Sequence, residues 1–449
     1  MNLKTLRCLA LSCILVAPWA AAAETIEIVV WAPADRNERY RYEGVALAAK
    51  ILNEELKIEG RSARVTVRAQ AFSGAQTWQK LKQGFSLAVE AGRGPHIIVG
   101  GHEDIAVWGR AGIIQPIEDL VDLDQWPLSD VHPNLWPMMS YDGRVWGIPQ
   151  DAEVRPFFGW IPHLKAIGYS NADIKALPKK IRDSEYTLRN ILEDAKKIQD
   201  AGLVEKGYGF YPRPTKGSDY WQFYVAAGGE MMDPKTSKLV LDKAALLKYY
   251  RFFHEAVFKY GVTKKNHLGM EWDQWYKEVA SGRAGLWHGG SWHYARYTRK
   301  EGLDDFFGKV TYGLIPSGGP GGKAVTLTHP LVYLISKRAR GAEAEMAGRL
   351  ITIVSEPRLN TLHAIASAHL GITRSQEKTA LYADDRWTTE MTKLLKGAIA
   401  LPNNVHFGRY DQIVWRGLTA SWTGASPQEA VNTVVKEIRA VMGDKVIIR

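Results

Sequence analysis

Two carboxylates, Asp151 and Glu153, have the type and spacing that glycoside cleavage could use. In an extended segment, residues two apart project from the same face, and a pair of carboxylates can serve as acid and nucleophile on a glycosidic bond. The same oxygens can instead accept hydrogen bonds from the hydroxyl groups of a bound solute, with no proton transfer. Two interpretations follow, a secreted glycoside hydrolase and a binding protein, and we favour the binding protein.

Histidines and glycines between residues 288 and 323 suggest metal or phosphate chemistry, but both motifs are incomplete. His288 and His293 lack the helical His-Glu-x-x-His spacing of a zinc site, and the glycines between them would break a helix. Ser317 and Ala324 stand where a phosphate loop ending at Lys323 requires a glycine and a Ser or Thr. We therefore expect no catalytic residue, no metal and no cofactor.

Aromatic residues flanked by glycine or small residues are candidates for stacking on a sugar ring. The chain has 16 tryptophans and 19 tyrosines, and most of them belong in a core on general grounds. Trp292 follows Gly289-Gly290-Ser291, and Tyr220 and Trp221 follow the stretch 212–218, which is rich in Pro, Gly and Ser. Because the apolar face of a sugar ring packs on an aromatic plane, we expect these aromatics in a cleft between elements.

The first 23 residues have the pattern of a cleavable secretory signal. A positively charged start and an apolar run over residues 9–19 are followed by the small residues Ala20–Ala23. We therefore expect cleavage after Ala23 and a mature protein in the periplasm. Both cysteines, Cys8 and Cys13, lie in the signal, so we expect a mature chain without disulfides.

The formal net charge of +10 at pH 7 admits more than one partner. A basic protein can bind nucleic acid or an acidic ligand. The sequence has no dense Lys/Arg run and no nucleic-acid motif, so we expect no nucleic-acid partner. The charge then indicates either a solvated basic surface or an anionic ligand.

Hydrophobic periodicity predicts a repeated strand–helix pattern that would position these residues. Strands are expected at residues 26–31, 64–69 and 97–99, with amphipathic helices at 45–56 and 78–88 between them. This β–α–β–α–β order predicts an open, mostly parallel sheet. Ligands of such sheets bind beyond the carboxyl ends of the strands, so the segments after the first and third strands are candidates for the site.

Turn and cap signals predict the elements that follow. Asp142-Gly143 predicts a tight hairpin over residues 141–149, and Ser426 predicts the start of a helix through a capping box. Further helices are expected at 190–201, 242–260 and 272–281, and strands at 230–241 (around a turn), 325–327 and 331–335.

The order of these segments resembles the family-1 extracellular solute-binding proteins of ABC importers, a group that includes maltodextrin-binding proteins. The resemblance covers essentially the whole chain after the signal. The motifs that carry it are Gly94-Pro95-His96-Ile97-Ile98, Gly143–Pro149, Ala226-Ala227-Gly228-Gly229, Ser281–Leu286 with Gly290-Ser291-Trp292, and Leu401-Pro402-Asn403 followed by Tyr410.

The resemblance implies an α/β fold with two lobes, a hinge and a central ligand cleft. The first lobe would comprise residues 24–149 and 324–372, and the second residues 150–323 and 373–449. It also implies a monomeric, non-enzymatic protein that captures a sugar, oligosaccharide or polyol by hinge closure and delivers it to a membrane permease.

The resemblance also implies which side chains face the ligand. These are Asp35, Arg36, His102, Glu103, Asp151, Glu153, Arg155, Trp221, Trp292 and Tyr410, with Arg374 within reach of the cleft. The chain departs from maltodextrin binders at Gly100, Asp104, Lys216 and Ser218, so we expect a solute other than maltose. An anionic solute such as glycerol 3-phosphate is the alternative, since three of the candidates are arginines.

Overall fold

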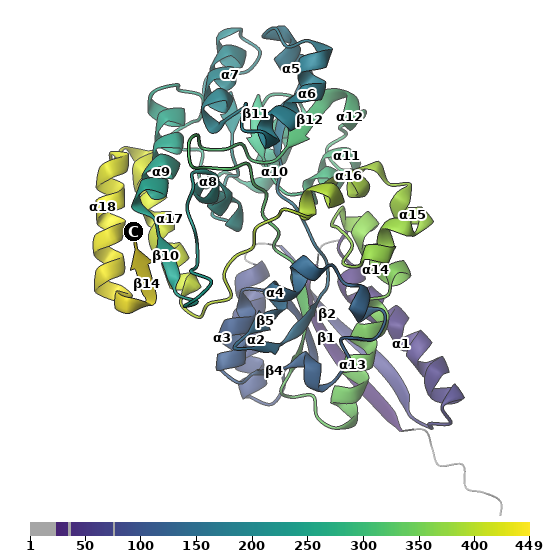
Figure 1. Cartoon of the computed structure of the whole chain (residues 1–449). Helices are drawn as coiled ribbons and strands as arrows, with labels where there is room; N and C mark the ends of the chain where they lie inside the picture. The colour runs from purple at the N-terminus through teal and green to yellow at the C-terminus, as the bar shows by residue number, and fades with distance from the viewer. Residues whose placement is uncertain (1–23, 35–36, 75–76) are drawn as a thin grey trace, which may run out of the picture.

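The computed structural model describes residues 24–34, 37–74 and 77–449. The predicted signal and the candidates Asp35 and Arg36 lie outside the described residues. The described chain forms two lobes, each built around its own sheet, and several segments pass between them (Figure 1). Among the described helices, none is long and apolar enough to cross a membrane.

The sheet of the first lobe confirms the predicted strand–helix pattern. Its three N-terminal strands are parallel, and a strand from much later in the chain, β13, pairs antiparallel with β3. The strand order is β2-β1-β3-β13-β4, with β7 also paired to β13. The strands are β1 (Thr25–Pro33), β2 (Arg64–Phe72), β3 (Ile97–Gly101), β4 (Ile114–Gln115), β7 (Gly147–Pro149) and β13 (Leu331–Ser336).

Helices cover this sheet as the periodicity predicts. The apolar stripe of α1, which includes Val45, Leu52 and Leu56, is fully buried, and α13 packs against the same helix. The helices of this lobe are α1 (Tyr40–Ile58), α2 (Thr77–Glu90), α3 (Asp104–Arg110), α4 (Trp136–Met139), α13 (Ala342–Val354) and α14 (Pro357–Ser367). The predicted hairpin is present as β5 (Ser140–Tyr141) and β6 (Arg144–Val145), with Asp142 and Gly143 at positive φ.

The second lobe has a smaller sheet with the order β12-β8-β11-β9. The strands are β8 (Phe157–Trp160), β9 (Phe210–Tyr211), β11 (Leu286–His288) and β12 (Val310–Gly313). Its helices are α5 (Ile161–Ala166), α6 (Asn171–Arg182), α7 (Leu188–Asp200), α8 (Trp221–Ala226), α9 (Lys243–Phe258), α10 (Trp272–Ala280), α11 (His293–Arg299), α12 (Phe306–Lys309) and α16 (Arg386–Leu395). Together the two lobes confirm the expected α/β architecture.

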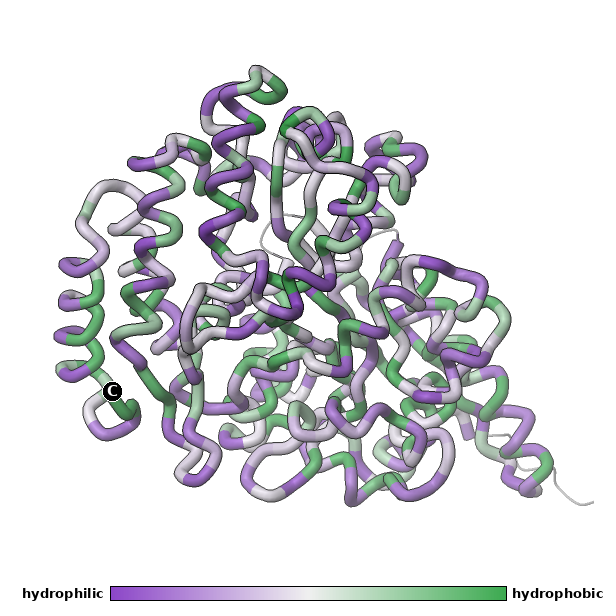
Figure 2. Tube along the Cα trace, turned by 45° about the horizontal axis from the view of Figure 1, so that its top comes forward, coloured by the Kyte–Doolittle hydropathy of each residue, from purple (hydrophilic) through white to green (hydrophobic). Residues whose placement is uncertain are grey.

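The C-terminal helices α17 (Phe407–Thr423) and α18 (Pro427–Val441) pack on α9. The predicted capping box starts α18, because Ser426 and Glu429 bond each other's backbone. Figure 2 shows hydrophobic residues along the inner side of this helix and hydrophilic ones along its outer side. Next to it, β10 (Leu239–Leu241) pairs with β14 (Val446–Ile448), and the expected strand–turn–strand at 230–241 is reduced to β10 and one bridge from Met232.

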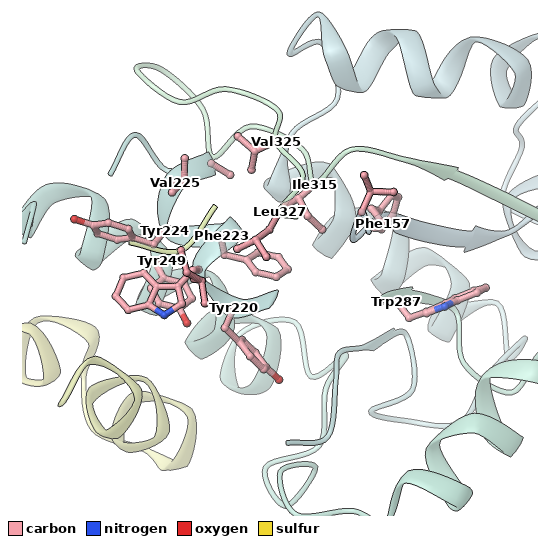
Figure 3. Packing of buried hydrophobic residues seen from close by; sticks show 14 of the residues in the cluster. Phe157, Tyr220, Phe223, Tyr224, Val225, Tyr249, Trp287, Ile315, Val325 and Leu327 are labelled. Carbon is pink, nitrogen blue, oxygen red and sulfur yellow. The ribbon is translucent and has the colours of Figure 1, made fainter. Parts of the chain in front are cut away.

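The predicted strand at residues 325–327 is absent, for a structural reason. Val325 and Leu327 each form a single bridge and belong to the buried core, where Leu327 lies beside Phe223 and Val325 near Val225 (Figure 3). The backbone N–H of Leu327 donates to the side chain of Gln222, at 2.9 Å, instead of to a neighbouring strand. This segment is one of the passages between the lobes.

Residues 151–156 form another passage and pair with neighbouring segments on both sides. Ala152 bridges to Leu370, and the backbone N–H of Arg155 donates to the hydroxyl of Thr326, at 2.8 Å. The last passage runs from α15 (Ala380–Ala383) to α16, since Trp387 packs on aromatic residues of the second lobe. The lobe boundaries at residues 149, 323 and 372 stay a prediction.

Candidate functional site

Asp151 is a buried anchor at the first passage between the lobes. Its carboxylate lies 3.3 Å from the Nη2 atom of Arg41 and 3.0 Å from Nε2 of His363, and it accepts the backbone N–H of Leu331. Burial alone would raise the pKa of Asp151, but His369, His363 and Arg41 together hold this pKa far below its ordinary value. Asp151 is therefore ionised, and its oxygens are occupied within the protein.

Glu153 and Arg155 form the next part of the passage. The guanidinium of Arg155 donates from Nε to Glu153 at 2.7 Å, and from Nη1 to Asp219 at 2.7 Å and to the hydroxyl of Ser218. Burial raises the pKa of Glu153, although Arg155 and His329 oppose this effect. The predicted pair Asp151 and Glu153 do share a neighbour: the Nε2 atom of His369 lies 3.8 and 3.9 Å from their respective carboxylates.

Trp292 is the predicted aromatic residue that stays half-buried beside these charges. Its indole lies parallel to the imidazole of His369, with centroids 5.7 Å apart, and the guanidinium of Arg155 sits 5.0 Å from its ring centre. A Cβ atom at Gly290 would overlap this ring, so the glycine lets the chain turn directly against the indole. The glycine motif that marks Trp292 in the sequence therefore has a packing role.

Trp221 and Tyr410 lie elsewhere, in the core of the second lobe. Their rings stack on each other with centroids 5.3 Å apart. The indole N–H of Trp221 donates to Asp411 at 2.8 Å, and the hydroxyl of Tyr410 donates to the carbonyl of Val240 at 2.6 Å. Tyr410 is fully buried and Trp221 nearly so. In this structure neither ring offers a free face to a ligand, which corrects the expected stacking role.

His102 and Glu103 follow β3 at its carboxyl end, as predicted for a site on a parallel sheet. Glu103 lies 3.0 Å from Nζ of Lys82 and 2.7 Å from Nε2 of His329. Burial would raise the pKa of Glu103, but His329 and Lys82 lower it well below its ordinary value. Burial also raises the pKa of the neighbouring Asp104 to about 6.

Arg374 does not join this group. Its side chain is exposed, lies 3.4 Å from Asp130 and donates to the carbonyl of Ser129. The expected reach into the cleft is thus wrong for this structure, because a nearer carboxylate holds the guanidinium on the surface of the first lobe.

Sequence reasoning missed several members of the group, and His329 shows why. It stands two residues before β13, whose first residue Leu331 pairs with Gly101 at the end of β3. Because β13 is antiparallel to β3, its start meets the carboxyl end of β3, which brings His329 beside Glu103. An antiparallel pairing between distant segments has no local signal. Lys82, Arg41, His363, His369 and Asp219 were also missed, because they reach the group through tertiary contacts of helices and loops that are distant in the sequence.

A separate cavity of about 900 Å³ also lies between the lobes. Its walls come from residues 140–142 of the first lobe and from residues 228–232, 321–323 and 399–405. Of the sequence motifs, it contains Leu401-Pro402-Asn403 and the glycines of Ala226-Ala227-Gly228-Gly229, but none of the predicted ligand-facing side chains. Its walls combine apolar side chains with polar ones, among them Asp142, Glu230, Lys323 and Asn403. Because the predicted ligand-facing residues gather elsewhere, we take the polar cluster around Trp292, Glu153, Arg155, His329 and Glu103 as the candidate site, and call it the Trp292 cluster.

The sequence profile of the family described as bacterial extracellular solute-binding protein matches residues 57–386. A maltotriose-binding protein of Pyrococcus abyssi is 24% identical over 180 residues, which is 40% of this chain. That match spans about a third, 35%, of the Pyrococcus protein.

Solved structures show the same two-lobe fold. The GacH receptor of Streptomyces glaucescens, solved alone and with acarbose, superposes with a TM-score of 0.74 at 14% identity, over 94% of this chain and 99% of that one. Maltose-bound MalE3 of T. maritima gives a TM-score of 0.73 at 17% identity, over 92% and 99%. The sugar-binding protein MalE of Xanthomonas citri gives 0.74 at 15%, over 94% and 98%.

Proposed function

The chain belongs to the bacterial extracellular solute-binding protein family, and on this premise we propose that it captures a neutral, hydroxyl-rich solute between its lobes. The solute would be a sugar, an oligosaccharide or a polyol. The protein would release it to the permease of an ABC importer, without altering it.

The observation that carries this proposal is the half-buried ring of Trp292 beside one negatively charged hydrogen-bond acceptor and one positively charged hydrogen-bond donor. Glu153 can accept and Arg155 can donate next to the indole. A sugar is complementary to this arrangement. Its apolar ring face can stack on the indole, and the hydroxyl groups at its rim can form hydrogen bonds with the charged side chains. Solved relatives in the comparison are described as bound to maltose, tagatose and mannobiose, which supports the same class of ligand.

The pairing of charges favours a neutral solute over an anionic one. Among the described residues of the Trp292 cluster and its immediate partners, Arg155 faces both Glu153 and Asp219, and Lys82 faces both Glu103 and Asp104. A phosphate would have to compete with these carboxylates for each cation. A neutral hydroxyl can add to the network without breaking an ion pair.

Binding without turnover is the better use of the acidic pair. A glycosidase needs one carboxyl that can give up a proton and a second that is free to attack or to activate water. The carboxylate of Asp151 is instead held ionised by Arg41 and two histidines. This supports assigning Asp151 to the architecture of the passage and leaving Glu153 to contact the solute.

Closure of the lobes would complete the site. A solute that contacts both lobes favours the closed arrangement by the difference in its affinity for the two states. The proposed location is the periplasm, after cleavage behind Ala23, as the extracellular family and the predicted signal suggest.

A thermal-shift panel of neutral sugars, polyols and their phosphorylated counterparts tests this proposal. At least one neutral compound should raise the melting temperature in proportion to RT ln(1 + [L]/Kd), and its phosphorylated counterpart should not. Stabilisation by phosphorylated compounds alone would establish the anionic alternative. Release of product from chromogenic glycosides would establish the hydrolase.

A further inference from the structure

Three side chains at the end of β3 form a group with the donor set of a transition-metal site. They are His102, Glu103 and His329, and one ligand atom from each lies within 4.8 Å of the other two. Nε2 of His329 is 2.7 Å from Oε2 of Glu103, and Nδ1 of His102 is 4.0 Å from the same oxygen. Ligand atoms placed tetrahedrally at zinc bond lengths lie roughly 3.4 Å apart, between these two distances.

The surroundings of His102 leave a lone pair directed at this group. The imidazole is fully buried, and its Nε2 atom lies 3.3 Å from the carbonyl oxygen of Leu401. A carbonyl only accepts hydrogen bonds, so the proton belongs on Nε2 and the lone pair on Nδ1. Nδ1 has no hydrogen-bond partner among the described residues. A histidine whose second nitrogen is fixed by a backbone carbonyl is the usual arrangement of a metal ligand.

Glu103 is oriented in a matching way. Lys82 contacts Oε1 of the carboxylate at 3.0 Å, which leaves Oε2 as the oxygen nearest both imidazoles. Lys82 thus fixes the carboxylate from the side opposite the histidines. Glu103 and His329 are partly exposed, so a fourth ligand, water or a hydroxyl group, can reach an ion between the three side chains.

A second group, Asp151 with His363 and His369, has the same composition but a different occupant. Nη2 of Arg41 lies 3.3 Å from Oδ2 of Asp151 and 3.4 Å from Nε2 of His369. The guanidinium already supplies the positive charge there and fills the space between the ligand atoms. We therefore consider only the first group, His102, Glu103 and His329, as a metal site.

We propose that His102, Glu103 and His329 bind a divalent transition-metal ion, with Zn²⁺ as the best match to two imidazoles and one carboxylate. The ion would tie the end of β3 to the start of β13 and present an open coordination position within the Trp292 cluster, to which Glu103 and His329 belong. This proposal does not depend on the identity of the transported solute.

Calorimetric titration of the untagged, chelator-treated exported protein with Zn²⁺ and with Co²⁺ tests it. Wild type should bind one equivalent of either ion, and Co²⁺ should give the intense visible absorption of a low-symmetry, four- or five-coordinate site. His329→Gln and Glu103→Gln change partly exposed residues and should fold. Each should weaken binding by at least about 100-fold, beyond the loss usual for outer-shell partners.

His163→Gln, on α5 in the other lobe, is the matched control and should bind the metal like wild type. If wild type binds no equivalent of either ion, or if the two variants bind as tightly as the control, the metal site does not exist. Solute binding measured separately on metal-free protein distinguishes that outcome from a failure of the proposed function.

Discussion

The indole of Trp292 and the imidazole of His369 lie in parallel planes, 10° apart, across the junction of the two lobes. His369 follows α14, which packs on α1 of the first lobe, whereas Trp292 immediately precedes α11 of the second. The indole of Trp292, which we assign to solute recognition, therefore packs on one face against His369 of the first lobe. The contact between Trp292 and His369 thus links closure of the lobes to recognition of the solute.

Replacing Trp292 with alanine should weaken solute binding at least about tenfold, because stacking and apolar area are both lost. Since the ring is only half-buried, the melting temperature should fall by no more than a few degrees, in line with a loss of about 1 kcal/mol. Trp126→Ala, at a tryptophan that is 58% exposed, is the control and should bind normally. A large loss of stability with unchanged affinity would place Trp292 in the core.

Gly290→Ala should have nearly the same effect on binding without removing the ring. The new Cβ atom would overlap the indole of Trp292, so the ring must leave its present place beside Arg155 and His369. Titration calorimetry should show weaker binding, and tryptophan fluorescence should change. Gly408→Ala, where no atom lies within 4 Å of the added methyl group, should change neither. Normal affinity in Gly290→Ala would show that the position of the ring does not matter.

Asp151→Asn should destabilise the fold by about 3–5 kcal/mol, because the buried Arg41 would lose its fully buried carboxylate partner and keep only Glu38, which is partly exposed. Urea unfolding measures this loss. Asp183→Asn removes an exposed partner of Lys179 and should cost no more than about 1 kcal/mol. Equal losses of unfolding free energy in the two variants would mean that the buried contacts of Asp151 stabilise the fold no more than an exposed ion pair does.

Stability should fall with acidification partly through His369. Burial lowers the pKa of His369 to about 3, whereas an unfolded histidine titrates near ~6.5. Between these values the unfolded chain binds the extra proton, so stability is lost as the pH falls below ~6.5. His369→Gln should therefore show a smaller drop in unfolding free energy from pH 7 to pH 5 than wild type. His406→Gln should keep the full drop, and a full drop in both variants would contradict this assignment.

The N-terminal half of the first sheet was predictable because its signals are local. Residues 26–31 and 64–69 show strand character, and the helix between them shows its apolar stripe, so β1, α1 and β2 follow from periodicity alone. The insertion of β13 between β3 and β4 is a pairing over a long sequence distance, and that pairing brings His329 to Glu103.

The candidate site was predictable to a similar degree. Alternation in an extended segment predicted that Asp151 and Glu153 project from one face, and both carboxylates do lie near His369. The glycines before Trp292 indicated the tight turn of the chain against its ring. The expected cleft positions failed for Trp221, which follows a loop, and for Tyr410, which the family resemblance implied, because neither pattern separates a cleft wall from a core. Their stacking partners come from distant helices.

A crystal structure with the stabilising solute bound is the most direct test of the central claim. We predict that a ring of the solute packs on the indole of Trp292 and that a hydroxyl group bonds to Glu153. Density for the solute only in the cavity lined by residues 140–142 and 399–405, with Trp292 untouched, would contradict the claim.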